Sequence, residues 1–67
     1  MITLTVNGKE RQLPAETALL DYLKSLDIDV RLVAAAYNGE VVPRRRYGEV
    51  RLRQGDTLEI VRMVGGG

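Results

Sequence analysis

The chain of 67 residues contains no cysteine and no histidine, and its only aromatic side chains are three tyrosines. These absences exclude the commonest zinc ligands, a catalytic thiol, and any general base or triad built on imidazole. Disulfides are excluded as well, so a domain of this size must fold on apolar packing alone. The chemistry left to the chain is that of carboxylates, amines, hydroxyls and the chain ends.

The sequence also has no large excess of charge of either sign, because its ten Lys and Arg residues and nine Asp and Glu residues give a net charge of +1. Such a balance gives no general attraction to nucleic acid. No apolar run approaches the roughly 20 residues of a membrane span, and no signal peptide is recognisable. We expect a cytoplasmic protein, monomeric when free, with no nucleic-acid or membrane partner and no bound metal or cofactor.

The first half of the sequence predicts a β-hairpin followed by one helix. Residues 2–6 alternate between apolar side chains and threonine, Asn7-Gly8 is a strong hairpin-turn signal, and Lys9 to Leu13 is polar enough for an edge strand. Thr17 is the expected N-cap of a helix of about ten residues that starts at Ala18. The leucines expected to form its buried face are Leu19, Leu20, Leu23 and Leu26.

The second half predicts further strands. Val33 to Tyr37 and Glu40 to Val42 flank a second Asn-Gly pair, which indicates another hairpin, and Val50 to Arg53 forms a short strand. Thr57 to Val64 is the longest apolar run, which favours a central position in the sheet. Two hairpins around one helix predict an α+β fold of four to five strands with the helix on one face.

Two groups of charged residues are candidate sites. The acidic pairs lie outside any apolar context that would raise a carboxylate pKa, so acid–base chemistry is not expected from them. The densest basic run is Arg44, Arg45 and Arg46. It is either a solvated loop or a patch for an acidic protein partner, with Arg44 and Arg45 as the docking candidates.

The terminal glycines Gly65, Gly66 and Gly67 are not explained by a turn, because no element follows them. Chain ends are often disordered, and glycine is tolerated there. A glycine tail can also lie extended in a channel where any Cβ would clash. By elimination, the carboxylate of Gly67 is the best reactive candidate in the chain, because activation with ATP would let a sulfur or amine nucleophile attack its carbonyl.

The sequence resembles a known family over essentially its whole length. The segments that carry the likeness are "NGEVVPR" at Asn38 to Arg44, "QGDTLEIV" at Gln54 to Val61 and the terminal "VGGG". They are similar to the bacterial thiamine-biosynthesis sulfur carriers, the ThiS family, which are relatives of ubiquitin. The resemblance implies a β-grasp fold with the last strand parallel to the first, a domain spanning residues 1–64 and a flexible tail spanning residues 65–67.

The resemblance also implies the chemistry and the partners. A ubiquitin-activating-type adenylyltransferase would use ATP and magnesium to adenylate Gly67, and a cysteine-derived sulfur donor enzyme would supply the sulfur of a thiocarboxylate. A thiazole synthase would then receive that sulfur, while Gly65 and Gly66 thread into the partner active sites. The chain itself would be a carrier and not an enzyme.

Three alternatives stay open at the level of sequence. The acceptor of the sulfur could be molybdopterin or tRNA; Gly67 could instead be joined to lysines, as in a ubiquitin-like modifier; or the domain could be a binding module with an idle tail.

Partner docking is expected on the open face of the sheet. The candidates there are Tyr37, Arg62 and Met63, with Val61 beside them.

Overall fold

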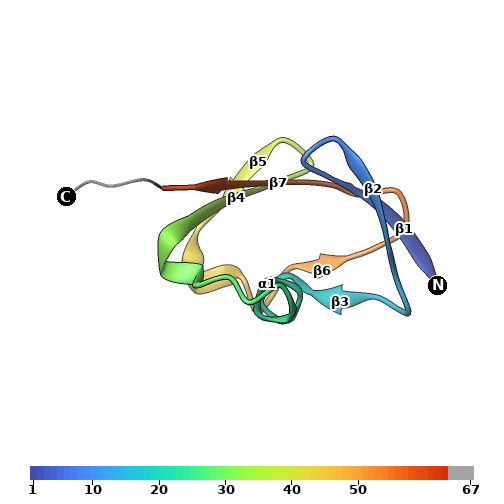
Figure 1. Cartoon of the computed structure of the whole chain (residues 1–67), viewed down its shortest axis with the longest axis horizontal. Helices are drawn as coiled ribbons and strands as arrows, with labels where there is room; N and C mark the ends of the chain where they lie inside the picture. The colour runs from blue at the N-terminus through green and yellow to red at the C-terminus, as the bar shows by residue number, and fades with distance from the viewer. Residues whose placement is uncertain (64–67) are drawn as a thin grey trace.

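The structure is a computed structural model that describes residues 1–63 and combines a curved sheet with one short helix (Figure 1). The chain begins with a hairpin of β1 (Ile2–Val6) and β2 (Lys9–Leu13). Asn7 and Gly8 form its turn with φ of 51° and 80°, in the left-handed region that these two residue types tolerate best. The first predicted hairpin is therefore confirmed.

The helix α1 (Leu19–Ser25) has seven residues and is preceded by a short strand. Residues Thr17–Ala18 form this strand, β3, which pairs antiparallel with β6 (Arg51–Leu52). The prediction of Thr17 as the helix N-cap is wrong, because its hydroxyl donates back to the carbonyl of Ala15 at 2.9 Å. The prediction that the helix starts at Ala18 is wrong by one residue.

The helix needs no side-chain cap because a distant loop satisfies its first N–H groups. The N–H of Leu19 donates to the carbonyl of Val50 at 2.8 Å, and the N–H of Leu20 donates to the carbonyl of Tyr47 at 3.0 Å. The unpaired donors of a helix N-terminus are thus bound by main-chain carbonyls from the second half of the chain. The sequence around Thr17 does not indicate this contact, because the carbonyl groups that make it lie far along the chain.

The predicted leucine face is correct at Leu19 and Leu23, which are fully buried. Leu26 is 44% exposed, so its assignment to the core is wrong, whereas Tyr22 is buried and was not predicted. The helix ends at Ser25, and the positive φ of Asp27 (61°) redirects the chain after the last turn. Leu26 therefore lies beyond the part of the helix that packs on the sheet.

The elements after the helix match the predicted order. They are the 3₁₀ turn η1 (Val30–Leu32), β4 (Val33–Tyr37), β5 (Glu40–Val42), the 3₁₀ turn η2 (Arg44–Arg46), β6, and β7 (Thr57–Arg62). The second hairpin is confirmed, the predicted strand at residues 50–53 shortens to β6, and the final strand ends at Arg62. Val64 lies outside the described residues. Within residues 1–63, none of the helices has the length and apolar character required to cross a membrane.

Five strands form one mixed sheet in the order β2-β1-β7-β4-β5. β7 pairs parallel with β1, with Thr5 opposite Thr57 and Val6 opposite Leu58, and antiparallel with β4 along its whole length. The central position of the last strand, the edge position of β2 and the parallel first and last strands are all as expected. This is the α+β arrangement of the predicted β-grasp.

The core lies between the sheet and the layer formed by α1, β3 and β6 (Figure 1). β7 contributes the fully buried Leu58 to it, and Tyr47 is buried there as well, with its hydroxyl donating to the carbonyl of Val33 at 3.4 Å. The buried residues of this core are Leu4, Val6, Leu19, Tyr22, Leu23, Val33, Ala35, Tyr47, Leu52 and Leu58. All of them are apolar or tyrosine, as the lack of disulfides requires.

Replacement of the buried leucine of the central strand tests this packing. We expect Leu58→Ala to lower the free energy of unfolding by about 3 kcal/mol, because it leaves a cavity that the neighbouring strands cannot close. The matched control is Val61→Ala on the same strand, where the side chain is exposed and the change should stay within about 0.5 kcal/mol. Urea denaturation followed by circular dichroism measures both, and equal losses would contradict the assignment of the core.

Candidate functional site

The candidate site is the chain end, and the described structure reaches its base at Met63. Gly65, Gly66 and Gly67 lie outside the described residues. β7 leads to them, and the N–H of Met63 donates to the carbonyl of Leu32 at 2.8 Å, one residue beyond the end of the strand. The main chain is therefore held by hydrogen bonds as far as Met63, and Val64 alone separates it from the terminal glycines.

Asn7 binds the central strand from the tip of the first hairpin. Its side-chain Oδ1 accepts from the N–H of Ile60 at 2.8 Å, and its Nδ2 donates to the carbonyl of Ile60 at 3.2 Å. Its own N–H donates to the carbonyl of Leu58 at 2.9 Å. The amide side chain thus takes the place of the main-chain carbonyl and N–H that a longer β1 would offer to Ile60, and it extends the pairing of β7 by these two bonds.

Asn38 does the same on the other edge of β7, from the tip of the second hairpin. Its φ is 50°, its N–H donates to the carbonyl of Thr57 at 2.8 Å, and its Oδ1 accepts from the N–H of Thr57 at 2.8 Å. Sequence reasoning assigned both asparagines to turns and missed this second role. The Asn-Gly motif shows the turn, but only the sheet order shows what the side chain can reach.

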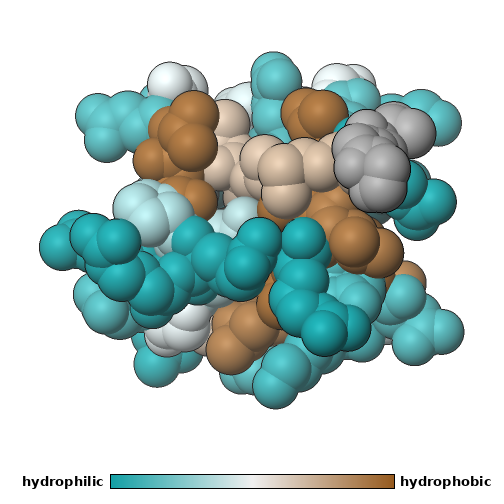
Figure 2. Space-filling view, turned by 90° about the vertical axis from the view of Figure 1, so that its left-hand side faces the viewer, coloured by the Kyte–Doolittle hydropathy of each residue, from teal (hydrophilic) through white to brown (hydrophobic). Residues whose placement is uncertain are grey.

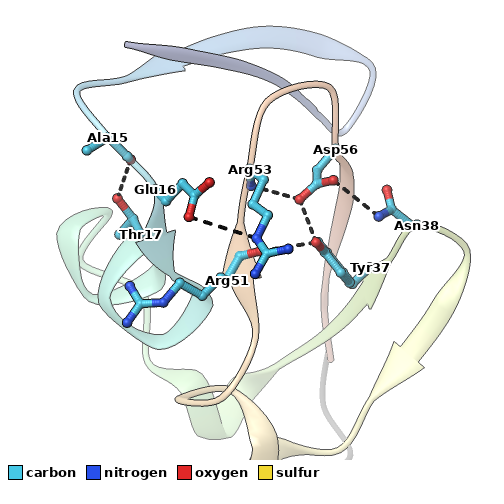
Figure 3. A network of polar contacts seen from close by, with 8 residues as sticks. All are labelled: Ala15, Glu16, Thr17, Tyr37, Asn38, Arg51, Arg53 and Asp56. Atoms are coloured by element: carbon cyan, nitrogen blue, oxygen red, sulfur yellow. Dashed lines mark hydrogen bonds and ion pairs between the residues drawn. The ribbon is translucent and has the colours of Figure 1, made fainter.

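Asp56, in the loop before β7, anchors a network of polar contacts (Figure 3). One carboxylate oxygen accepts from the hydroxyl of Tyr37 at 2.5 Å and from the N–H of Arg53 at 2.8 Å, and the other accepts from Nδ2 of Asn38 at 3.3 Å. The Tyr37 hydroxyl also lies 3.1 Å from the carbonyl of Arg51. The network ties β4, β6 and the start of β7 together, so the "QGD" segment has a structural role.

The network shifts two ionisation equilibria. Burial raises the pKa of the Tyr37 hydroxyl, and the hydrogen bond to Asp56 raises it further. Burial also acts to raise the pKa of Asp56, but the hydrogen bonds from Tyr37, from the N–H of Arg53 and from Asn38 outweigh it, so the pKa of Asp56 lies below its ordinary value. Neither group is poised for proton transfer near neutral pH.

A second ionic contact lies near the end of β7. Asp29 accepts from the side chain and the N–H of Arg31, and these hydrogen bonds lower the pKa of Asp29 to about 2. Asp29 also lines a cavity of about 460 Å³ together with Arg62 and Met63. As predicted for the acidic residues, this carboxylate stabilises local structure and is not tuned for acid–base chemistry.

The open face of the sheet carries an apolar surface close to the end of β7. The strand registers place Ala34 opposite Val61 and Ala36 opposite Val41, all on the face turned away from α1. Val41 is 78% exposed and Val61 is 59% exposed. We call these four residues the open-face patch. Figure 2 views the end of the molecule where β7 finishes, and hydrophobic side chains gather in the upper half of this end, above a band of hydrophilic ones.

The predicted docking residues do not all share that face. Tyr37 lies opposite Leu58 and Arg62 lies opposite Val33, so both side chains belong to the helix side of the sheet. Tyr37 packs against the core, and its placement on the open face is wrong. Arg62 borders the cavity on the helix side together with Met63, so its placement on the open face is wrong as well. The alternation of Val61 with Leu58 and Ile60 was predicted correctly, but Arg62 continues the row of Leu58 and Ile60 and not that of Val61.

Arg44 and Arg45 lie on η2, and the structure brings only the first of them toward the end of β7. Arg44 Nη2 donates to the carbonyl of Arg31 at 3.3 Å, next to the Leu32 carbonyl that binds Met63. Arg45 is exposed. Their role as a patch for an acidic partner stays a prediction.

The sequence of this chain is similar to those of known proteins. Residues 4–67 match the model of the ThiS family, so the match runs through the terminal glycines. The sulfur carrier protein ThiS of Bacillus subtilis is 37% identical over 65 residues, covering 96% of this chain and 98% of that protein. A thiazole synthase of Paramagnetospirillum magneticum is 42% identical over 64 residues, which cover 96% of this chain but only 20% of that protein. The chain thus spans about a fifth of the length of that relative.

A solved structure agrees with the fold. The crystal structure of a thiamine biosynthesis protein (ThiS) from Geobacter metallireducens superposes with a TM-score of 0.86 at 29% sequence identity, covering 98% of this chain and all of that one. The predicted β-grasp is therefore confirmed, with the five-stranded sheet and single helix described above.

The Asp56 network predicts a specific pH dependence of stability. A carboxylate whose folded pKa is lowered stabilises the fold above the unfolded aspartate pKa of about 3.9, and this contribution is lost as the pH falls toward the folded pKa. We expect Asp56→Asn to lower the free energy of unfolding by about 1–2 kcal/mol at pH 7 and by less at pH 3.

Urea denaturation at the two pH values measures this difference. The matched control is Glu49→Gln, which neutralises an exposed carboxylate in a neighbouring loop and should change stability little at either pH. A loss for Asp56→Asn that is the same at pH 7 and pH 3 would argue against a role for the carboxylate charge.

Proposed function

This chain belongs to the ThiS family, and from that premise we propose that the carboxylate of Gly67 is the group that carries sulfur. The chain is a carrier protein of thiamine biosynthesis and not an enzyme. The observation that carries the proposal is the family match through residue 67, because it includes the three terminal glycines that the proposed chemistry requires. In this proposal residues 1–64 serve as the domain and residues 65–67 as the segment that enters the partner enzymes.

The proposed chemistry needs activation of the chain end by a partner. A carboxylate with a pKa near 3.5 is an anion at neutral pH and a poor electrophile. In an adenylyltransferase of the ubiquitin-activating type, a carboxylate oxygen of Gly67 attacks the α-phosphorus of magnesium-bound ATP, and pyrophosphate leaves. A sulfur nucleophile derived from cysteine then attacks the Gly67 carbonyl, and AMP leaves. With hydrosulfide the product is the thiocarboxylate. With a persulfide the product is an acyl disulfide, and a thiol then reduces this disulfide to release the thiocarboxylate.

A thiazole synthase is the proposed acceptor of the sulfur. Relatives named thiazole synthase contain a segment similar to nearly all of this chain, which supports a functional association between the two kinds of protein. Gly65 and Gly66 have no side chains, so an extended tail can enter a narrow active site where any Cβ would clash. Because adenylation consumes ATP, we place this cycle in the cytoplasm.

The open-face patch is the proposed docking surface for these enzymes. Its four residues are small or β-branched and form an exposed apolar surface on the strands that surround the end of β7. Burying Val41 and Val61 against a partner removes apolar area from water close to the tail that must react. Met63 and the basic Arg44 lie at the margin of this region, whereas Tyr37 is better explained by the Asp56 network.

Intact-mass spectrometry tests the proposed chemistry. Incubation with ATP, magnesium, the activating enzyme and a sulfur source should raise the mass by the difference between one sulfur and one oxygen atom. An alanine added after Gly67 should abolish this shift, because it moves the reactive carboxylate away from the glycine. The matched control adds the same alanine before Met1 and should react normally. No shift in the unmodified protein, with partners proven active on another carrier, would refute the proposal.

A separate experiment tests the docking surface. We expect Val41→Asp to weaken binding to the activating enzyme about tenfold, because it places a charge in an apolar contact. Thr3→Asp, on the polar part of the same face, serves as the control and should leave affinity nearly unchanged. Titration calorimetry gives both values. Equal affinities for the two variants would show that the open-face patch is not used for docking. This outcome is independent of whether Gly67 carries the sulfur.

A further inference from the structure

The central strand has an uncovered edge on one side near its end. β7 runs past the tip of the β1–β2 hairpin (Figure 1). The bond from the N–H of Met63 to Leu32 shows that Met63 points its main-chain groups toward β4, so those of the preceding Arg62 point to the opposite side. On that side the last partner of β7 is Asn7, which binds Ile60. Within residues 1–63, the N–H and carbonyl of Arg62 have no hydrogen-bond partner.

An open groove of about 580 Å³ lies under this edge, on the helix side of the sheet. Its apolar lining is Val6, Tyr22, Leu26, Ile28 and Ile60. Ile28 also lines the cavity of about 460 Å³ that borders Arg62 and Met63, so the two hollows adjoin along the uncovered edge. The exposed Leu26 is explained in this way, because it forms part of the groove wall and not of the core.

The rim of the groove is basic at the end formed by β2. Lys9 and Arg11 alternate with Glu10, so both side chains lie on the helix side, and both line the groove. No carboxylate lies within ion-pair distance of either one among residues 1–63. The adjoining cavity of about 460 Å³ is lined by Asp27 and Asp29, of which Asp29 is paired with Arg31. A ligand that matches these charges is acidic beside β2 and not acidic beside Asp27.

We propose that an extended, acidic and apolar segment of a partner protein binds here as an added strand. Its main chain pairs with the N–H and carbonyl of Arg62, its apolar side chains contact Ile28 and Ile60, and its carboxylates face Lys9 and Arg11. A strand is favoured over a small anionic ligand, because the edge offers one main-chain donor and one acceptor next to the apolar side chains of Ile28 and Ile60. This surface is distinct from the open-face patch and does not depend on the sulfur chemistry.

NMR titration of the ¹⁵N-labelled protein with two synthetic peptides tests the proposal. The peptide Glu-Thr-Glu-Thr-Val-Thr-Val carries its glutamates and valines on one face of an extended strand. It should cause saturable shifts at the amides of Lys9, Arg11, Ile28, Ile60 and Arg62, with a dissociation constant on the order of 1 mM. The peptide Lys-Thr-Lys-Thr-Val-Thr-Val, which differs only in the sign of its charges, should cause none. Equal binding of both peptides, shifts on another surface, or no saturable shift up to about 5 mM would each overturn the proposal.

Charge-reversal variants identify the basic rim. We expect K9E/R11E to weaken binding of the glutamate peptide at least about tenfold, while Lys24→Glu, an exposed helix position outside the groove, changes it less than about twofold. Circular dichroism confirms that each variant is folded. An affinity of K9E/R11E equal to that of Lys24→Glu would overturn the assignment of the rim.

The pairing with Arg62 is tested by removing only its N–H. Because this N–H points away from β4, Arg62→Pro leaves the β4–β7 ladder intact, as proline is tolerated where a strand N–H faces outward. Arg62→Ala removes the same side chain but keeps the N–H. We expect Arg62→Pro to bind the glutamate peptide about fivefold more weakly than Arg62→Ala. Equal affinities in the two folded variants would exclude strand addition.

Discussion

Hydrogen bonding along both edges of β7 is the constraint on which the rest of the molecule depends. The strand is the third of five, and it joins the two hairpins, which have no pairing with each other across the sheet. β1 reaches it from one side in parallel, and β4 from the other side antiparallel. Its inward residues, led by Leu58, then form the surface on which α1 packs. Loss of β7 would leave two separate hairpins, and isolated hairpins are marginal in water.

The same constraint gives the two Asn-Gly turns a common purpose. Each turn ends a hairpin beside β7, and each asparagine uses its side-chain amide to satisfy a main-chain N–H that no strand residue reaches. Asp56 secures the entry to the strand by binding Tyr37, Arg53 and Asn38. The strand leading to the tail is therefore fixed at its start, its middle and its end by groups from four different parts of the chain.

Local signals in the sequence were sufficient for most of the fold. Alternation, Asn-Gly pairs and leucine spacing predicted both hairpins, the helix and the central last strand, because these features depend on neighbours within a few residues. The failures depend on distant contacts. The cap of α1 comes from Tyr47 and Val50, and the side of the sheet on which Tyr37 lies follows from its register with Leu58. The role of Gly67 rests on chemical elimination and family likeness and stays a prediction.

The parallel pairing of β1 and β7 has a mechanical consequence. Because the two strands run in the same direction side by side, tension between the start of β1 and the end of β7 slides them past each other. The bonds at Thr5, Asn7 and Leu58 are then loaded together in shear and cannot open one after another like a zipper. A pull between these two ends would therefore have to break the bonds together before β1 and β7 could separate.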